Sequence, residues 1–485
     1  MVIYTAVGFG GNGAMLLPGL VTSLGNFPEV RGMVTGLLKS VFFLCASLYT
    51  ELDVAVHQNT AVFLLLLALL PAAAALACIP LLRPLPVRRS TNSGVAAATG
   101  MATRRVFFVA SAWTLGLAVF MAVTVLLQTE HPITFTPLVP VAFSLMLGLL
   151  ACYMLLPTLY GAISRGGGSG GEDPLTGALL PGGRLSGGST AYGAAGDGSA
   201  GGSAAVAAAP EGGGEVGDEG SGGADGEAHY VGDAANITLG QCMARPDYWC
   251  IYTMYVINLA TGLTLSNNLE GVATAKGASQ VAGYVALASV ATCVGTLCGA
   301  HISEALLDGH IALQRPWCVA PAFALQALGA LGVACAGPGA LYGAVFVVML
   351  GYGANLSILP AVLHERFGQR HFGSIWAFSQ TAMVVASLAF ATGLAASVYE
   401  AHASVSPTTG LQTCTGNACF ATTFLVLGAL ALVGAAIGGL LATLLTDFYA
   451  ALVAARTKAE PGGYFFALTG SMRGRGQPGR SCDGL

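Results

Sequence analysis

Long apolar stretches dominate the 485-residue chain and restrict the folds that it can adopt. A helix of about 20 apolar residues crosses a hydrocarbon core ~30 Å thick, and the chain contains roughly eleven stretches of that length. Inside a bilayer, every backbone N–H and C=O must find a partner within the protein, which at this segment length favours helices. The sequence therefore predicts an all-α polytopic membrane protein.

The composition supports the same class. Hydrophobic residues make up 54% of the chain and charged residues only 9%, whereas a soluble domain carries about 25% charged residues. The formal net charge is −4 and the basic residues are scattered over many loops, so no nucleic-acid partner is expected. The expected partners are the lipid bilayer and a small-molecule solute.

The distribution of basic residues predicts the orientation. We place the spans at residues 2–24, 33–52, 60–82, 106–127, 138–160, 248–269, 281–302, 315–336, 341–363, 372–398 and 420–445. Seventeen of the 19 Lys and Arg residues then lie on one side, Lys276 lies on the other, and Lys39 lies inside the second span. Because loops rich in Lys and Arg remain in the cytosol, that side, which includes the C-terminus, is predicted to be cytosolic.

The chain divides into four segments on this basis. Residues 1–160 form an N-terminal membrane half of five spans, and residues 246–446 form a C-terminal half of six. The segment 161–245 between them is rich in glycine, with 26 glycines in residues 161–240, and such a composition buries too little apolar surface to fold. We expect it to be a disordered cytosolic linker, and we expect residues 447–485 to be a cytosolic tail.

Motifs for cofactor or metal chemistry are incomplete. The glycines of residues 8–13 imitate a dinucleotide-binding fingerprint, but Pro18 interrupts the helix that should follow and no second strand is predicted. His364 and Glu365 begin a zinc-protease pattern, but Gly368 occupies the position of the second histidine. No acid, base and nucleophile occur together. We therefore expect no cofactor, no metal site and no enzyme activity.

Two of the twelve cysteines differ from the others in their position. Cys414 and Cys419 lie on a predicted non-cytosolic loop before the last span, where an oxidising compartment permits a disulfide. Most other cysteines lie in apolar stretches, where a thiol behaves as a small hydrophobe. A bridge between Cys414 and Cys419 and a pair of free thiols remain as alternatives.

Lys39 is a charged residue that falls well inside a predicted span rather than at its edge. A charge at the bilayer centre is costly unless it faces a cavity or a partner, so one interpretation is a cation that faces a substrate pathway. The alternative is a side chain that reaches the cytosolic interface about one and a half turns away.

A second group of polar residues follows the apolar run of the sixth span. Helical spacing places Thr264, Asn267 and Asn268 on one face. If they point into a central cavity, they can hydrogen-bond a small polar ligand, and if they lie past the membrane edge, they belong to a loop. We favour the cavity.

The ninth span contains glycines and a proline in the segment Gly351–Pro360, which also includes Asn355. Such residues loosen a helix at mid-membrane, and transporters use loosened helices to expose backbone groups to substrate. We therefore expect Asn355 to line the substrate pathway, although helix packing alone also selects glycine. His364, Glu365 and Arg366 follow at the predicted cytosolic end and are candidate gate contacts.

Several short motifs occur in a fixed order along most of the chain outside the linker. They are Asn26-Phe27-Pro28-x-x-Arg31-Gly32, Gly36-Leu37-Leu38-Lys39, Asp247-Tyr248-Trp249, Thr261-Gly262-Leu263-Thr264, Asn268-Leu269, Ser303-Glu304, Gly351-Tyr352-Gly353-Ala354, Phe367-Gly368, Phe372-Gly373 and Cys414-x-Gly416-x-x-Cys419-Phe420. In this order and spacing the chain resembles the plant and algal nodulin-like proteins of the major facilitator superfamily.

The resemblance implies two six-helix halves that rock around a central site, here with two additional spans before the linker. It also implies three further helices ahead of residue 1, so the first half is expected to be incomplete. Asn267 stands where relatives often have Asp, and an amide does not carry a proton as a carboxylate does. Glu304 becomes a fourth gate candidate, but the segment before it, with His301, lacks the arginine that is usual there. The gate is therefore expected to be weakened.

These observations together predict a transporter-like protein that moves a small organic solute, with organic anions as a candidate class, by alternating access. The alternative is a non-transporting structural or receptor-like membrane protein, or an inactive fragment of a transporter. The residues expected in the substrate pathway are Lys39, Thr264, Asn267, Asn268 and Asn355.

Overall fold

The computed structural model describes a large part of the chain. The described residues are 19–24, 27, 30–55, 62, 64–69, 72, 76, 93–130, 237–278, 281–308, 313–405 and 412–459. Most of the spans expected at 2–24 and 60–82, the whole span at 138–160, most of the linker and the tail beyond residue 459 lie outside them.

Six helices among the described residues are long and apolar enough to cross a membrane. They are Thr103–Val123, Gly283–Leu307, Arg315–Cys335, Pro338–Phe367, Phe372–His402 and Ala418–Leu444. These six coincide with the fourth and the seventh to eleventh predicted spans. The chain is an all-α polytopic membrane protein, as its sequence predicts.

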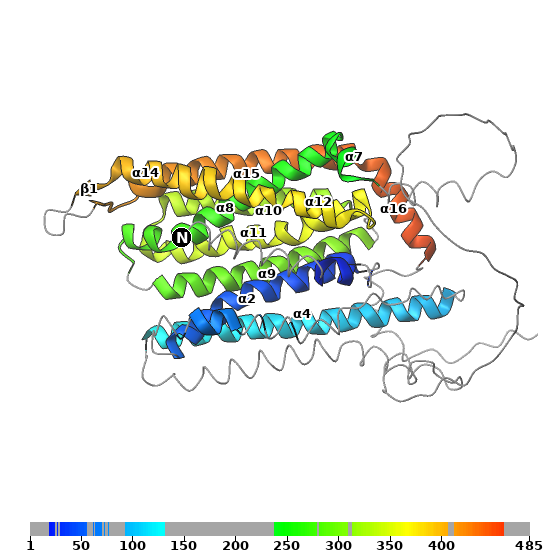
Figure 1. Ribbon diagram of the computed structural model, residues 1–485, viewed down its shortest axis with the longest axis horizontal. Helices are drawn as coiled ribbons and strands as arrows, with labels where there is room; N and C mark the ends of the chain where they lie inside the picture. Colours follow the sequence, from blue (N-terminus) through cyan, green and yellow to red (C-terminus); the bar gives the residue numbers. More distant parts are fainter. Residues whose placement is uncertain are drawn as a thin grey trace, which may run out of the picture.

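The helices lie side by side as roughly parallel rods (Figure 1). The long ones are α2 (Arg31–Ala55), α4 (Ser93–Glu130), α8 (Pro246–Ala275), α9 (Val281–Asp308), α10 (Arg315–Cys335), α11 (Pro338–Phe367) and α15 (Ala418–Leu444). Short α7 (Leu239–Met243) and α16 (Thr446–Ala459) lie at one end of the rods, and the two-stranded hairpin of β1 (Ser404–Val405) and β2 (Gln412–Thr413) lies at the other. We call the helices α8 to α16 the C-terminal bundle.

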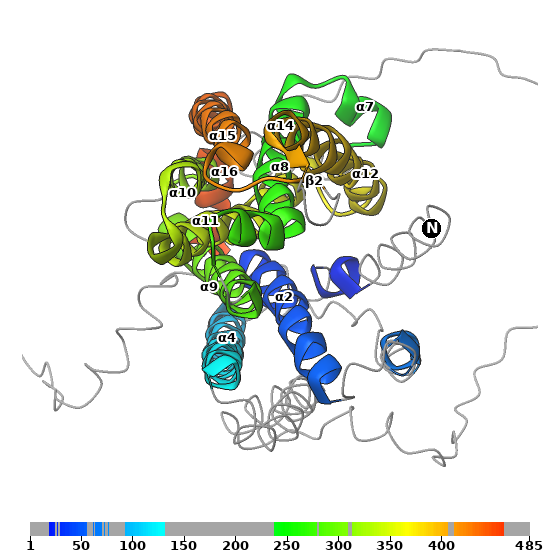
Figure 2. The same cartoon turned by 90° about the vertical axis from the view of Figure 1, so that its left-hand side faces the viewer.

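The helix α9 connects the C-terminal bundle to the N-terminal helices. It packs against α11 on one side and against α2 and α4 on the other (Figure 2). Glycine allows the closest of these approaches, because a methyl group at Gly36 of α2 would lie 2.3 Å from the Ala300 Cβ atom of α9. Such small-residue contacts are a common means of packing helices in a membrane.

The ninth predicted span is not loosened, and that expectation is wrong. The helix α11 runs unbroken from Pro338 to Phe367 through Gly351, Gly353 and Pro360. The two glycines serve packing instead, since an added Cβ would lie 2.5 Å from the Ala322 carbonyl oxygen at Gly351 and 2.2 Å from the Thr292 carbonyl oxygen at Gly353.

The irregular helix is the tenth span. It consists of α12 (Phe372–Ser379), α13 (Thr381–Ala386), the π-helical segment η3 (Ser387–Leu394) and α14 (Ala395–His402). A π-helical turn widens the helix locally and frees backbone groups for other partners. Here the Ala391 carbonyl oxygen accepts a hydrogen bond from the Asn268 side chain of α8, at 3.0 Å.

The first part of the expected tail is also structured. Residues Thr446–Ala459 form α16, which follows α15 after the single residue Leu445. Two of its apolar positions account for this, because Leu445 just before the helix and Tyr449 within it are both almost fully buried. The segment therefore belongs to the C-terminal bundle rather than to a free tail.

Candidate functional site

The two ends of the rods differ in chemistry. The end that carries Arg31, Arg245, Arg315 and Arg366, together with α7 and α16, is called the basic end here. The opposite end, which carries the bond between Cys414 and Cys419, is called the disulfide end.

A buried charged cluster lies at the basic end. Arg315, the first residue of α10, has a side chain with 0% exposure. Its Nη2 atom donates to Glu304 at the end of α9, and its Nε atom donates to Glu365 of α11 at 2.9 Å. Its Nη1 atom donates to the Ser303 hydroxyl at 2.9 Å. One guanidinium therefore ties the ends of three helices together.

The helix α16 joins this cluster. The Tyr449 hydroxyl donates to the Glu365 Oε2 atom at 3.1 Å. Beside it, Arg366 donates to Asp247 of α8 at 2.7 Å and places its guanidinium over the Phe448 ring, 5.2 Å from the centroid. The basic end of the C-terminal bundle is thus held by two adjacent ion-pair groups that share α16.

The N-terminal helix α2 meets the cluster through Gly32. A methyl group at Gly32 would lie 2.6 Å from the Glu304 Oε2 atom and 2.8 Å from the Arg315 Nη1 atom, so only glycine allows this approach. Gly32 lies in the first turn of α2, where backbone N–H groups and the helix dipole favour a nearby carboxylate. Arg315, Glu304 and Glu365 together carry a formal charge of −1, which the positive first turn of α2, beginning with Arg31, complements.

His364 lies next to this contact. Its ring is fully buried, its centroid is 4.7 Å from that of Phe372, and neither ring nitrogen has a hydrogen-bond partner among the described residues. The structure thus places the four sequence-predicted gate candidates, which are Glu304, His364, Glu365 and Arg366, at one end of the bundle.

Lys39 lies two turns further along α2 and is directed into the protein. Its residue is 7% exposed, and its Nζ atom donates to the Tyr255 hydroxyl of α8 at 3.1 Å. The same atom lies 4.9 Å from the centroid of the Trp376 ring of α12 and 5.7 Å from that of the Tyr255 ring. No carboxylate among the described residues forms an ion pair with it. The ammonium group therefore bridges α2 and the C-terminal bundle without a counter-ion.

The polar residues of the sixth span differ in their surroundings. All three lie within the helix α8, so none belongs to a loop. Thr264 is buried, and its hydroxyl has no hydrogen-bond partner among the described residues. Asn267 is exposed. Asn268 donates to the Thr264 carbonyl at 2.9 Å and to the Ala391 carbonyl at 3.0 Å, so it links α8 to η3.

Asn355 lies in a polar region in the interior of the C-terminal bundle. It is fully buried, and neither atom of its side-chain amide has a partner among the described residues. On the neighbouring helices, Gln326 of α10 donates to the Asn258 Oδ1 atom of α8 at 2.8 Å, and Asn258 approaches the Tyr352 carbonyl at 3.5 Å. Lys39, Thr264, Asn267, Asn268 and Asn355 thus do not converge on one point.

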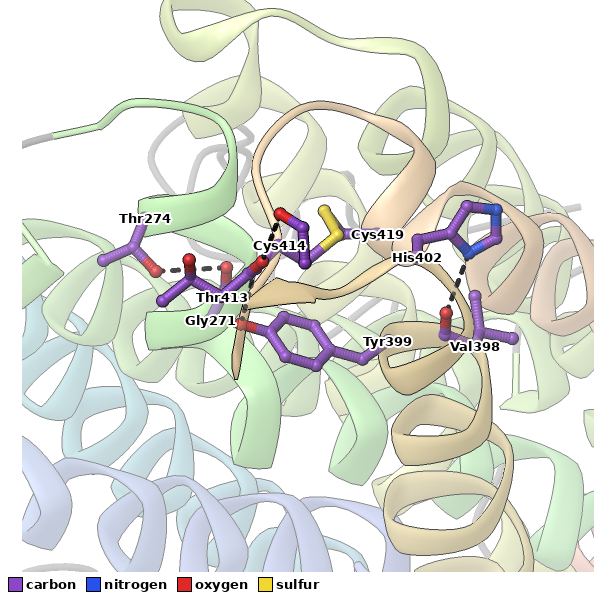
Figure 3. Close-up of a disulfide and its surroundings, with 9 residues drawn as sticks. Gly271, Thr274, Val398, Tyr399, His402, Thr413, Cys414 and Cys419 are labelled. Atoms are coloured by element: carbon purple, nitrogen blue, oxygen red, sulfur yellow. Dashed lines mark hydrogen bonds between the residues drawn. A yellow bond between two sulfur atoms is a disulfide. The ribbon is translucent and has the colours of Figure 1, made fainter. Parts of the chain in front are cut away.

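The disulfide end is held by a different set of contacts. A disulfide joins Cys414 and Cys419, and the Cys414 N–H donates to the Tyr399 hydroxyl at 3.2 Å (Figure 3). Lys276, just after α8, donates to the Ala336 carbonyl at 2.8 Å and to the Asn417 Oδ1 atom at 2.7 Å. Burial lowers the pKa of this ammonium. All of these residues belong to the C-terminal bundle.

Sequence reasoning missed Arg315, Tyr449 and Asp247. It expected a weakened gate because no arginine precedes Glu304, but Arg315 supplies a guanidinium to Glu304 from eleven residues downstream. The strength of a gate at this position stays a prediction. The available signal was the position of Arg315 at the first turn of an apolar helix. A cation there faces either lipid headgroups or a neighbouring carboxylate.

Comparison with protein families agrees with these features. A family model described as Nodulin-like matches residues 1–158, and a model described as NFD4, C-terminal domain, matches residues 232–451. The two matches lie on either side of the glycine-rich segment and together cover most of the chain. No curated protein matches the sequence.

Proposed function

Because the chain belongs to the nodulin-like family, we propose that this transporter-type membrane protein is a secondary transporter that moves a small organic anion by alternating access. In this proposal α2 and its N-terminal neighbours form one moving unit and the C-terminal bundle forms the other. The solute binds between them, on Lys39.

The burial of Lys39 with no counter-ion among the residues that the structure describes carries the proposal. A lysine inside a bilayer costs at least about 2.5–3.5 kcal/mol on insertion scales, and the rings of Tyr255 and Trp376 recover only part of that cost through cation–π attraction. A protein that keeps such a group has a use for it. An anionic solute supplies the missing negative charge. Because Lys39 extends from α2 to Tyr255 of α8, a solute bound there contacts both moving units.

The contact at Gly32 supplies a gate. The first turn of α2 lies against Glu304 and Arg315, so the two units share a polar contact at the basic end beside the apolar packing of Met33 and Leu37. We propose that the basic end faces the cytosol and that this contact breaks when the site opens to that side. Glu365, Arg366 and Tyr449 keep the C-terminal bundle intact while it does so.

The polar residues of α8 have a supporting place in the proposal. The exposed polar side chains of α8 include Thr253 and, gathered in its last three turns, Ser266, Asn267, Glu270 and Thr274, which lie on neighbouring faces of the helix. Lipid is a poor solvent for such side chains. We assign them to the aqueous pathway between the two units.

Uptake into proteoliposomes tests the proposal. The purified full chain is reconstituted, and uptake is measured for a panel of radiolabelled organic anions, sugars and amino acids. We expect saturable uptake of at least one organic anion, reduced at least tenfold in Lys39→Met and partly retained in Lys39→Arg. Lys276→Met removes a lysine from the disulfide end and serves as the matched control, with uptake near that of the unchanged chain.

Two outcomes contradict the proposal. The first is a folded, reconstituted chain that takes up no member of the panel, which favours the non-transporting alternative. The second is anion uptake by Lys39→Met at the rate of the unchanged chain, which shows that the anion does not depend on this ammonium group.

A further inference from the structure

The hydrogen-bonding groups around the Lys39 ammonium group indicate which kind of anion it can bind. An ammonium group has three N–H donors, and within the described part of the chain a single acceptor contacts it, the Tyr255 hydroxyl at 3.1 Å. Two donors therefore remain for a ligand. They lie at the meeting point of α2, α8 and α12.

A further donor lies beside the same tyrosine. Gln380 follows α12, and its side chain lies within hydrogen-bonding reach of the Tyr255 hydroxyl. Its Nε2 atom is buried and makes no hydrogen bond of good geometry among the described residues. The amide nitrogen has two N–H groups, so even when one of them points to Tyr255, the other remains beside the ammonium group and can share an acceptor with it. Two donors, one of them charged, match the two oxygens of a carboxylate.

The rest of the surroundings is aromatic. The Tyr255 and Trp376 rings lie 5.8 Å apart at an interplanar angle of 81°, and Trp376 stacks on Phe372 at 5.9 Å. One turn beyond Lys39 on α2, the Phe43 ring lies 6.1 Å from that of Tyr352 of α11. The part of a ligand that extends from the carboxylate therefore meets ring faces and edges, which favour a flat aromatic body.

The charge balance limits the ligand to one negative charge. Lys39 is the cation at this position, and Arg315 at the basic end is already held by Glu304 and Glu365. A second carboxylate on the ligand would be buried among rings without a cation, which is strongly unfavourable.

We propose that Lys39, Gln380, Tyr255 and Trp376 form a binding site for an aromatic monocarboxylate. The carboxylate accepts from the Lys39 and Gln380 side chains, and the aromatic body packs against the surrounding rings. This assignment rests on the transporter function proposed above, whose solute class it narrows.

Equilibrium binding tests the assignment without requiring transport. Binding of radiolabelled benzoate is measured on the full chain in lipid nanodiscs, with acetate, terephthalate and benzyl alcohol as competitors. We expect saturable benzoate binding and at least tenfold weaker competition by each of the three, since acetate lacks the ring, terephthalate adds a second charge and benzyl alcohol lacks the charge.

Variants locate the binding. Lys39→Met is expected to weaken benzoate binding at least tenfold and Gln380→Leu about threefold to tenfold, while Lys39→Arg retains binding. Lys276→Met, at the disulfide end, leaves it unchanged. The elution volume of each variant in size-exclusion chromatography verifies that it is folded, and the binding of Lys39→Arg separates a loss of charge from a loss of structure.

The results distinguish this assignment from the transporter proposal. If the chain binds benzoate through Lys39 but transports no solute, the binding site is supported and the transporter proposal is contradicted. If the chain transports an anion but binds benzoate no better than terephthalate or acetate, the aromatic monocarboxylate site is contradicted and the transporter proposal is supported. Benzoate binding that survives Lys39→Met unchanged, or no saturable binding by the folded chain, also overturns the assignment.

Discussion

The basic end and the disulfide end close the same bundle in different ways. At the basic end, a fully buried guanidinium holds two carboxylates, and α2 of the N-terminal helices lies directly against them. At the disulfide end, a covalent bond and the hydrogen bonds of Lys276 join residues of the C-terminal bundle alone. One end combines internal ties with a contact between the two units, and the other has only internal ties among the described residues.

This difference separates two tasks. Contacts within one unit stabilise it best when they never break. The disulfide bond and the hydrogen bonds of Lys276 to neutral acceptors are contacts of this kind. A contact between moving units must break and form again, and a carboxylate against a helix N-terminus contributes typically about 0.3–1 kcal/mol at exposed sites and up to about 2 kcal/mol where it is partly buried, far less than a covalent bond. The comparison therefore supports the proposal that the moving contact lies at the basic end.

The largest expected effect comes from the removal of the buried guanidinium. Arg315→Met removes the guanidinium that both Glu304 and Glu365 contact, and loss of one partner of a buried ion pair costs about 3–5 kcal/mol. Lys276→Met at the disulfide end leaves neutral acceptors and is expected to cost about 1 kcal/mol. Thermal unfolding of both variants in detergent measures the difference. Equal losses of stability at the two ends would break the comparison.

A smaller effect is expected at the contact between the two units. Gly32→Ala places a methyl group against Glu304 and Arg315, and overpacking of this kind costs about 1–3 kcal/mol. Because α2 can move away from the added methyl group, we expect the basic end to open more often even when no solute is transported. A cysteine introduced at Ser303 is then expected to react faster with a labelling reagent. Gly271→Ala is the control, since its added Cβ meets only Phe420 Cζ at 3.2 Å within the C-terminal bundle. Unchanged labelling in Gly32→Ala would show that Gly32 does not hold the units together.

The smallest effect compares two tyrosines. Tyr449→Phe removes a hydrogen bond to the Glu365 carboxylate, and bonds to charged groups contribute about 1.5–3 kcal/mol. Tyr399→Phe removes an acceptor from a backbone N–H group at the disulfide end, and such neutral bonds contribute about 0.5–1.5 kcal/mol. The unfolding temperature is therefore expected to fall more in Tyr449→Phe. The reverse order would show that the charged cluster does not depend on α16.

Much of the fold could be predicted from the sequence, because lipid imposes a simple rule on segment length and polarity. The fourth and the seventh to eleventh spans were placed within a few residues by that rule alone. It failed at Gly351 and Gly353, since glycine has the same appearance in a loosened helix and in a closely packed one. It also failed at α16, which is too polar to read as a span and is ordered by the burial of Tyr449.

The candidate site was less accessible to sequence reasoning. Lys39 was identifiable because a charge in an apolar run is rare. Its partners were not, because Tyr255 lies 216 residues further along the chain and aromatic residues are common in such helices. Arg315 was counted among the basic loop residues, and only the packing of α9, α10 and α11 shows that it is buried.

Amide hydrogen exchange in nanodiscs tests the central claim most directly, that the two units separate at the basic end and not at the disulfide end. Peptides covering residues 30–38 and 300–307 are compared with peptides covering residues 268–278 and 414–420, in the unchanged chain and in Glu304→Gln. The account predicts faster exchange in the peptides of the basic end than in those of the disulfide end. This difference between the two ends is expected to be larger in Glu304→Gln, because the neutral amide weakens the attraction to the first turn of α2. Equally slow exchange at both ends in both proteins would contradict it.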